Sequence, residues 1–250
     1  MAKSYTKKYE VNYHDANYKL KCKLSSIVNF LCDAGTNQSE VLGDTIEEMM
    51  AKNYAWVFYK YDIKIYKYPS YRDVISITTE PIGFNKFYAY RKYYIQSEEG
   101  ELLGEGVALF FLINLKRRRP MRIPQEQYNL YGADGDGMDR EVEMEDIIKV
   151  DKEDYNKKFD IRYSDIDSNG HVNNVNYLEW AIESVPIEVI KEYQIKRLKI
   201  VFEKETIYGE TINVSATIIK EASGRLITVH IIKNKEGKEV TKLEATWEKE

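Results

Sequence analysis

The chain has 250 residues and a formal net charge of −4, from 37 Lys and Arg against 41 Asp and Glu. This balance excludes a uniformly basic nucleic-acid surface and leaves room only for local basic patches. With 43% apolar residues, two cysteines and no apolar run near the ~20 residues of a membrane helix, the sequence predicts a cytoplasmic globular protein with no disulfide framework. The first ten residues are polar and basic, so we expect no signal peptide.

The first half of the chain predicts a short strand, a helix and several long strands. The short strand lies near residues 5–13. The helix that follows has one apolar face, formed by Ile27, Leu31, Ala34 and Val41. Residues 107–113 are apolar on both faces of a strand, so we expect that strand in the centre of a sheet with a helix on one side.

The second half repeats this order after an acidic, glycine-rich stretch at residues 132–146. A strand near residues 157–163 precedes a helix that Pro186 ends. The apolar face of that helix is formed by Val175, Leu178, Ile182 and Val185. A later strand alternates through Leu226, Thr228, His230 and Ile232.

An internal repeat accounts for the shared order. Residues 9–15 resemble residues 159–165 at an offset of 150, and residues 71–77 resemble residues 208–214 at an offset of 137. Two copies of one unit predict an α+β protein in which each copy buries equivalent faces. One helix followed by antiparallel strands suggests a sheet wrapped around a helix, the hotdog arrangement.

Composition sets the expected domain boundaries. We expect an N-terminal domain at residues 1–128 and a C-terminal domain at residues 153–250. The acidic, glycine-rich residues between them, 129–152, are typical of an exposed linker.

The densest cluster of polar residues, 165–174, lies between the second-half strand and its helix. A helix N-terminus offers free backbone N–H groups and positive dipole potential, which can stabilise an oxyanion that forms on a carbonyl. We expect either Asn173 or Asn174 to cap the helix. The other polar side chains of the cluster are too many for capping alone.

Calcium binding is one alternative for this cluster. The start of an EF-hand loop is matched by Asp165, Asp167, Asn169 and Gly170. Position twelve, however, is Asn176 in place of a bidentate Glu, and a strand precedes the loop where an EF-hand has a helix. The three histidines also lack the spacing of a transition-metal site. We therefore expect no metal and no cofactor.

Residues 165–186, Asp-Ile-Asp-Ser-Asn-Gly-His-Val-Asn-Asn-Val-Asn-Tyr-Leu-Glu-Trp-Ala-Ile-Glu-Ser-Val-Pro, resemble the signature of acyl-ACP thioesterases, the bacterial relatives of the plant plastid enzymes. The stretch at Trp56, the segment 117–124 and a strand at 198–205 are similar to that family as well. The resemblance implies a tandem double hotdog, with the acyl pocket in the first domain and catalysis in the second. The plant enzymes carry a transit peptide, whereas this chain starts at its first strand.

The resemblance also implies a catalytic set. By motif, the family's catalytic residues map onto Asp167, Asn169, His171 and Glu205. The plant enzymes have a cysteine after this Glu, and Thr206 stands there in this sequence. Because Cys22 and Cys32 both lie in the first copy, a cysteine nucleophile is disfavoured.

Thioester hydrolysis requires an activated water, a stabilised oxyanion and orientation of both. Glu205 suits a general base or a direct nucleophile, and the residues leave this choice open. His171 suits orienting the water or carrying its proton, because an imidazole can both accept and donate a proton. Asn169 both donates and accepts hydrogen bonds, and Asp167 is expected to hold Asn169 or His171. If the family resemblance is set aside, Glu205 is also explained as a surface residue and His171 as a structural residue of the loop.

Three further assignments complete the sequence-based picture. Asp165 is expected to stabilise the turn, and His230, within an alternating strand, to pack in the core. The basic residues of segment 116–122 suit docking of an acidic acyl carrier protein or a pantetheine phosphate, but a solvated strand end has the same composition.

The predicted function is hydrolysis of fatty acyl-ACP, which releases a free fatty acid and ends chain elongation. The alternatives are an acyl-CoA thioesterase, since CoA and ACP share pantetheine, and a non-catalytic acyl-binding hotdog module that retains ligand without turnover. A hotdog dehydratase fits the order Asn, His and later Glu less well. The partner is acyl carrier protein with its acyl chain, no nucleic acid is expected, and a homodimer is left open.

Overall fold

The computed structural model describes residues 2–133 and 138–250. The chain divides into two compact units, Met1–Met144 (unit 1) and Glu145–Glu250 (unit 2). Part of the predicted linker, residues 134–137, lies outside the described residues. The linker itself stays a prediction, and its first three positions form the end of a helix.

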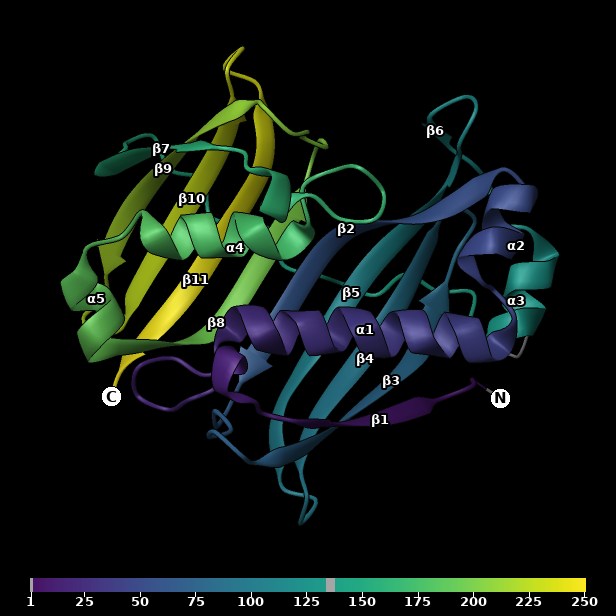
Figure 1. Cartoon of the computed structure of the whole chain (residues 1–250), viewed down its shortest axis with the longest axis horizontal. Coiled ribbons are helices and arrows are strands. Elements are labelled where there is room, and N and C mark those ends of the chain that lie inside the picture. The colour runs from purple at the N-terminus through teal and green to yellow at the C-terminus, as the bar shows by residue number, and fades with distance from the viewer. Residues whose placement is uncertain (1, 134–137) are drawn as a thin grey trace. The chain divides into compact units, whose positions relative to one another are not determined.

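Unit 1 is an antiparallel sheet with a long helix across it (Figure 1). The strands pair in the order β1-β3-β4-β5-β2, with a short β6 beside β5. Their bounds are β1 Tyr5–Glu10, β2 Tyr54–Ile65, β3 Val74–Phe84, β4 Tyr88–Ser97, β5 Leu102–Asn114 and β6 Arg119–Pro120. The helices are α1 Leu24–Leu42, α2 Ile46–Ala51 and α3 Gln125–Tyr131, with a 3-10 turn, η1, at Tyr13–Asp15.

Helix α1 packs closely on this sheet. Its residues Ile27, Leu31 and Ala34 are fully buried, as the periodicity predicts. A Cβ on Gly35 would lie 2.9 Å from the Tyr93 hydroxyl, so glycine permits the close approach of helix and strand. Val41 is 71% exposed. The prediction was wrong there because the buried face ends one turn earlier.

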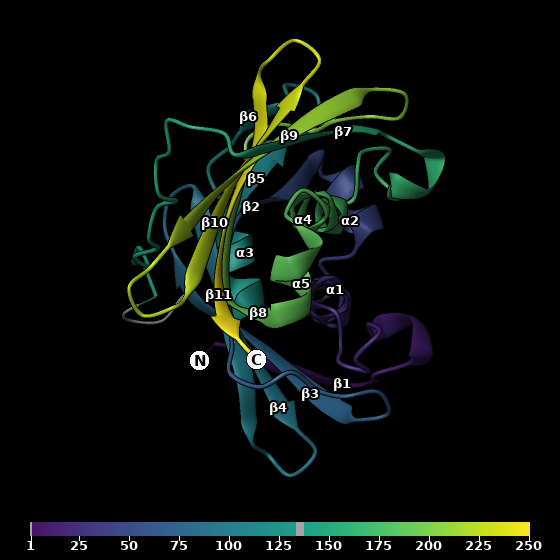
Figure 2. The same cartoon turned by 90° about the vertical axis from the view of Figure 1, so that its left-hand side faces the viewer.

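Unit 2 repeats the architecture of unit 1. Its strands pair in the order β7-β9-β10-β11-β8, which matches β1-β3-β4-β5-β2 strand for strand. The strand bounds are β7 Tyr155–Asp160, β8 Tyr193–Phe202, β9 Thr211–Lys220, β10 Leu226–Asn234 and β11 Glu239–Lys249. The 3-10 turn η2 is Tyr163–Asp165, and the helices are α4 Asn174–Glu183 and α5 Ile187–Glu192. Both helices lie on one face of the unit 2 sheet (Figure 2). The predicted α+β class and the duplicated hotdog unit are confirmed.

β5 and β10 form strands where the sequence predicts them. β5 lies between β4 and β2, in the interior of its sheet, as its two apolar faces indicate. The alternating side chains of β10 are all buried: Leu226, Thr228, His230 and Ile232. Helix α4 ends at Glu183, earlier than predicted, so Val185 is buried beyond the helix and Pro186 precedes α5.

An ion pair lies buried in unit 2. Lys199 of β8 and Glu244 of β11 are directly opposite in the strand register, and their charged atoms are 2.8 Å apart. Each residue is 5% exposed. The Glu244 carboxylate also accepts from the Ile148 backbone N at 2.8 Å, and Lys199 donates to the Asp146 carbonyl at 3.0 Å. The segment before β7 is therefore fixed to its own sheet.

Candidate active site

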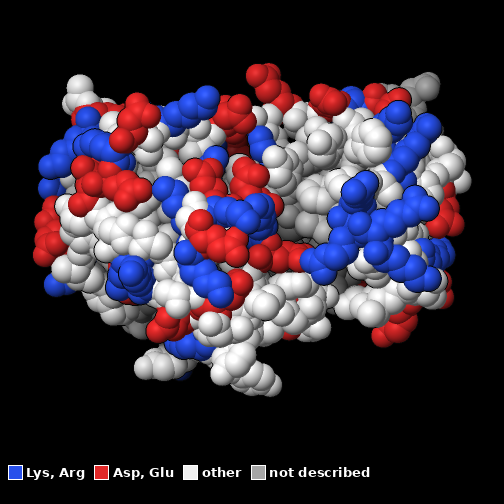
Figure 3. Space-filling model, turned by 90° about the horizontal axis from the view of Figure 1, so that it is seen from above, with Lys and Arg blue, Asp and Glu red and all other residues white. Residues whose placement is uncertain are grey.

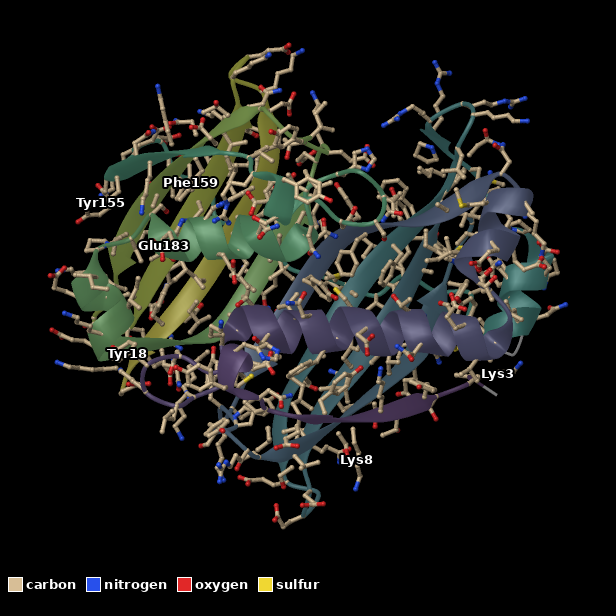
Figure 4. The ribbon with its side chains drawn as sticks, viewed as in Figure 1. Lys3, Lys8, Tyr18, Tyr155, Phe159 and Glu183 are labelled. Carbon is tan, nitrogen blue, oxygen red and sulfur yellow. The ribbon has the colours of Figure 1, made fainter. Side chains whose placement is uncertain are left out.

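The polar loop of unit 2, residues 161–173, connects β7 to α4, and both elements are held together beside it. Phe159 of β7 stacks on Trp180 of α4 with ring centroids 6.0 Å apart. Lys157 donates to the Glu183 backbone carbonyl at 3.1 Å. Figure 4 shows Phe159 and Glu183 on these neighbouring elements. These contacts hold together the two elements, β7 and α4, that the loop connects.

Asp165 organises the base of the loop. It is 1% exposed, and its carboxylate accepts from the Arg162 backbone N at 2.8 Å and from the Arg162 guanidinium at 2.7 Å. Burial alone would raise its pKa, but the hydrogen bonds and charge of Arg162 hold the pKa of Asp165 below its ordinary value. Its backbone carbonyl accepts from Asn173 N at 2.8 Å. Asp165 thus stabilises the turn, as expected.

The tip of the loop is a tight turn that positions Asn169. The backbone N of Asp167 donates to the His171 carbonyl at 2.8 Å, and Gly170 takes the left-handed conformation at φ 80°. The Asp167 carboxylate accepts from Asn169 N at 2.8 Å and from the Asn169 side-chain amide at 3.4 Å. Asp167 therefore orients Asn169, whose side chain is exposed to solvent.

His171 and Glu205 form the second pair. Nε2 of His171 lies 3.2 Å from Oε2 of Glu205, and the two side chains are 29% and 43% exposed. The backbone joins their segments, since Val172 N donates to the Thr206 carbonyl at 2.9 Å. The structure thus brings the four predicted residues together as two pairs, one at the loop tip and one between the loop and the segment after β8.

Glu205 lies in a loop, whereas the sequence placed it in a strand. β8 ends at Phe202. The backbone N–H groups of Glu203 and Lys204 both donate to the single carbonyl of Val240, at 2.8 and 3.1 Å. Two donors on one carbonyl end the regular ladder, and the chain then leaves the sheet before Glu205.

Thr206 is occupied by a structural contact. It is 1% exposed, and its hydroxyl lies 2.6 Å from the Tyr177 hydroxyl of α4. Burial raises the pKa of Tyr177 to about 12. This geometry gives Thr206 a packing role.

Asn173 and His230 have structural roles. Asn173 caps α4, since its side-chain oxygen accepts from Val175 N at 3.0 Å. His230 is 1% exposed, with Nδ1 3.2 Å from Ser184 Oγ and Nε2 2.9 Å from Thr228 Oγ1. Burial lowers the pKa of His230 to about 3. His230 therefore packs in the core, as expected.

The cluster does not have the surroundings of an EF-hand. A strand and a 3-10 turn precede the loop, and the carboxylate of Asp165 is occupied by Arg162. Asn176, at position twelve, donates its side-chain amide to the Asp165 carbonyl at 2.9 Å. Over residues 2–133 and 138–250, no group of three or more His, Cys, Asp or Glu side chains is arranged to hold a metal ion.

Unit 1 contains the same loop with different side chains. Asn17 N donates to the Lys21 carbonyl at 2.8 Å, and Lys19 N donates to the Asn17 side chain at 2.9 Å. These bonds correspond to those of Asp167, His171 and Asn169 at the offset of 150.

The unit 1 residue that corresponds to Glu205 is found with the offset of 137. Cys22 N donates to the Pro69 carbonyl at 2.8 Å, the equivalent of the bond from Val172 to Thr206. Tyr68 therefore takes the place of Glu205 at the offset of 137. Unit 1 keeps the loop and lacks its acid–base groups. The sequence offsets already contained the Tyr68 correspondence, which the motif comparison alone missed.

The architecture defines the class as a tandem double-hotdog protein, and the similarities to known proteins give the family. The model of the acyl-ACP thioesterase N-terminal domain matches residues 2–131, and that of the acyl-ACP thioesterase C-terminal domain matches residues 148–249. The chain belongs to the acyl-ACP thioesterase family.

The curated relatives are distant in sequence, and their matches cover most of this chain. A chloroplastic palmitoyl-acyl carrier protein thioesterase of Gossypium hirsutum is 22% identical over 97% of this chain, and oleoyl-acyl carrier protein thioesterase 1 of Arabidopsis thaliana is 24% identical over 88%. The matched regions cover 63% and 66% of those proteins. The chain therefore spans just under two thirds of the length of these relatives.

Solved structures share the fold. A putative oleoyl thioesterase from Lactobacillus plantarum superposes with a TM-score of 0.94 at 23% identity, covering 99% of this chain and 97% of that one. An acyl-ACP thioesterase from Bacteroides thetaiotaomicron gives a TM-score of 0.85 at 20% identity, with 98% of each chain covered. At these identities the superpositions establish the fold.

Proposed function

We propose that this protein hydrolyses the thioester of fatty acyl-ACP, releasing free fatty acid and ACP and ending chain elongation. The observation that carries the proposal is the His171–Glu205 pair, 3.2 Å apart beside the loop that carries the family motif. The named relatives act on palmitoyl-ACP and oleoyl-ACP, which supports an acyl-ACP substrate. We assign the activity to the cytoplasm; among the described residues no helix has the length and apolar character needed to cross a membrane.

In the proposed reaction, Glu205 accepts a proton from a water whose oxygen attacks the thioester carbonyl carbon. The carbonyl becomes an oxyanion, the carbon–sulfur bond breaks, and the pantetheine thiolate leaves and takes up a proton. His171, in contact with Glu205, orients the water or returns the proton to sulfur. This role requires its imidazole to remain within hydrogen-bonding distance of Glu205.

Asn169 is proposed to position the water or the thioester carbonyl through its side-chain amide. Its exposure to solvent and its bonds to Asp167 support this role. A preoriented amide gains more from a developing oxyanion than from a neutral carbonyl. Asp167 acts through Asn169 and is assigned as a positioning residue.

Within this proposal, unit 2 is the catalytic domain and unit 1 holds the acyl chain. The comparison of the two units supports the division, since unit 2 has His171 and Glu205 where unit 1 has Lys21 and Tyr68. Lys21 donates to Ser70 Oγ at 3.0 Å. Water activation by a lysine and a buried tyrosine is disfavoured at neutral pH.

The test uses the purified full chain and a panel of acyl-ACPs from medium to long chains. Release of free ACP thiol with matching free fatty acid is the expected result. Binding of acyl-ACP without release would identify the chain as a non-catalytic acyl-binding module. Faster release from acyl-CoA than from acyl-ACP would identify an acyl-CoA thioesterase, and light scattering on the same preparation determines whether the protein is a homodimer.

A further inference from the structure

A basic hairpin lies at the C-terminal end of β5, where the chain turns back into β6. β5 pairs with β6 through Ile113 opposite Pro120 and Asn114 opposite Arg119. Arg118 N donates to the Asn114 carbonyl at 2.8 Å, and Arg118 takes the left-handed conformation at φ 48°. The turn is therefore a defined structure. The exposed basic residues of this hairpin are Lys116, Arg117, Arg118, Arg119 and Arg122.

Most of these cations have no counter-ion among residues 2–133 and 138–250. In the described part of the chain, the side chains of Lys116, Arg117, Arg119 and Arg122 make no ion pair. By contrast, Lys52 pairs with Glu126 at 3.3 Å, and Lys92 pairs with Glu105. Figure 3 shows Lys and Arg side chains gathered at the end of unit 1 that carries the hairpin. Because the whole chain has a net charge of −4, this concentration of positive charge is a local feature.

The turn between β3 and β4 extends the basic surface. Ile123 N, just after the hairpin, donates to the Lys86 carbonyl at 3.0 Å, which fixes the two segments side by side. Lys86 lies over the ring of Phe87 at 5.3 Å, and Phe87 is 39% exposed. The surface formed by the hairpin cations with Lys86 and Phe87, called the basic hairpin surface below, thus combines positive charge with one apolar contact.

We propose that the basic hairpin surface docks the acidic carrier protein that delivers the acyl group. The inference rests on the proposed function, which supplies an acyl carrier protein as substrate. An acidic partner is repelled by the net negative charge of the chain and attracted at this surface, so the field steers it to one orientation. The exposed Phe87 ring adds the apolar contact found at the centre of most protein interfaces.

The distribution of the cations favours a protein surface over a single phosphate group. One phosphate is bound by a few donors that converge on one point. Here the charges follow the end of β5, the turn and the strand after it, across Lys116, Arg117, Arg119 and Arg122. Such a spread suits a row of carboxylates on a partner.

The test compares three substrates with the same acyl chain. Acyl-ACP has the protein and the phosphate, acyl-CoA has a phosphate without the protein, and acyl-pantetheine has neither. The variant replaces four cations: Lys116→Gln, Arg117→Gln, Arg119→Gln and Arg122→Gln. Arg118 is kept because its backbone closes the turn.

We expect kcat/KM for acyl-ACP to fall about tenfold at low salt, chiefly through KM, since electrostatic steering contributes at least this much to association. Added salt should lower wild-type kcat/KM toward that of the variant. Rates on acyl-CoA and acyl-pantetheine should be unchanged, which also shows that the variant is folded. Lys116→Gln with Arg117→Gln should reduce acyl-ACP turnover. As a control, Lys235→Gln with Lys238→Gln, at two exposed lysines of the β10–β11 turn, should leave it unchanged.

The outcomes separate this inference from the proposed function. Equal losses on acyl-ACP and acyl-CoA would assign the hairpin to a phosphate and overturn carrier docking. Unchanged acyl-ACP turnover in the four-residue variant, or an equal loss in the Lys235 and Lys238 control, would also overturn it. A wild-type protein that hydrolyses acyl-pantetheine or acyl-CoA and never acyl-ACP would instead refute the proposed function itself.

Discussion

His171 Nε2 and Glu205 Oε2 lie 3.2 Å apart, although the two residues come from different loops of unit 2. The loops are joined by the bond from Val172 N to the Thr206 carbonyl. The backbone bond between Val172 and Thr206, the residues next to His171 and Glu205, fixes the distance between the two side chains. This arrangement suits a base that must hold one water in a fixed position.

Glu205→Gln and Glu205→Ala should each lower kcat on acyl-ACP by about 10²–10⁴, because each removes the group that accepts the proton of water. Binding of acyl-ACP should change little. Thr206→Ala should cost far less, because an unactivated threonine hydroxyl is a poor nucleophile. Steady-state kinetics with circular dichroism of each variant checks both results. A folded Glu205→Gln protein with near-normal turnover would remove Glu205 from the mechanism.

Asn169→Ala and His171→Ala should each reduce kcat more than they raise KM, because the proposed contacts strengthen in the transition state. The double variant should lose less than the product of the two single losses if the residues act as one unit. Asp167→Ala should produce part of the Asn169→Ala effect and none beyond it in the Asn169→Ala background. Additive losses for Asp167 and Asn169 would show that Asp167 acts independently of Asn169.

The repeat and the loop were predictable from sequence because both depend on local patterns. The offsets of 150 and 137 align strands, turns and the loop. The structure repeats hydrogen bonds at the offset of 150, since the Asp15 and Asp165 carboxylates each accept from the backbone N three residues earlier. The positions of Asp167, Asn169 and His171 follow from one turn whose register is set by a few residues. The helix cap is equally local: the sequence limits it to Asn173 or Asn174, and the structure has Asn173.

Features that depend on distant strands were not predictable. β8 ends before Glu205 because Val240, on another strand, accepts two bonds. The pairing of Lys199 with Glu244 depends on the register between β8 and β11, which periodicity alone does not give. Val41 has the spacing of a buried residue, but it is exposed. Whether the last turn of α1 contacts the sheet depends on how far the sheet extends beneath the helix, which the helical periodicity does not give.

His230 predicts a pH dependence of stability. Its pKa is about 3 in the folded protein, well below its ordinary value, because burial disfavours the charged imidazole. Between pH ~6.5 and 3 the unfolded state therefore binds more protons than the folded state. The stability that the neutral ring contributes is complete above pH ~6.5 and is lost as the pH falls, by at most about 1.4 kcal/mol per pH unit.

Urea unfolding of the wild type and of His230→Gln over this pH range measures the effect. The wild type should lose stability more steeply than the variant as the pH falls below 6. The variant controls for the carboxylates, which titrate in both proteins. Parallel curves for the two proteins would mean that His230 does not titrate between the folded and unfolded states.

The buried pair of Lys199 and Glu244 gives the last prediction. Lys199→Met should lower the free energy of unfolding by about 3–5 kcal/mol, because it leaves the Glu244 carboxylate buried without its cation. Glu244→Leu should cost at least as much, since it also removes the acceptor of the Ile148 N–H. The double variant Lys199→Met with Glu244→Leu should recover part of the loss, because apolar side chains replace both charges. Urea unfolding of the three variants measures these differences, and a double variant as unstable as the sum of the single ones would show that the two charges do not interact.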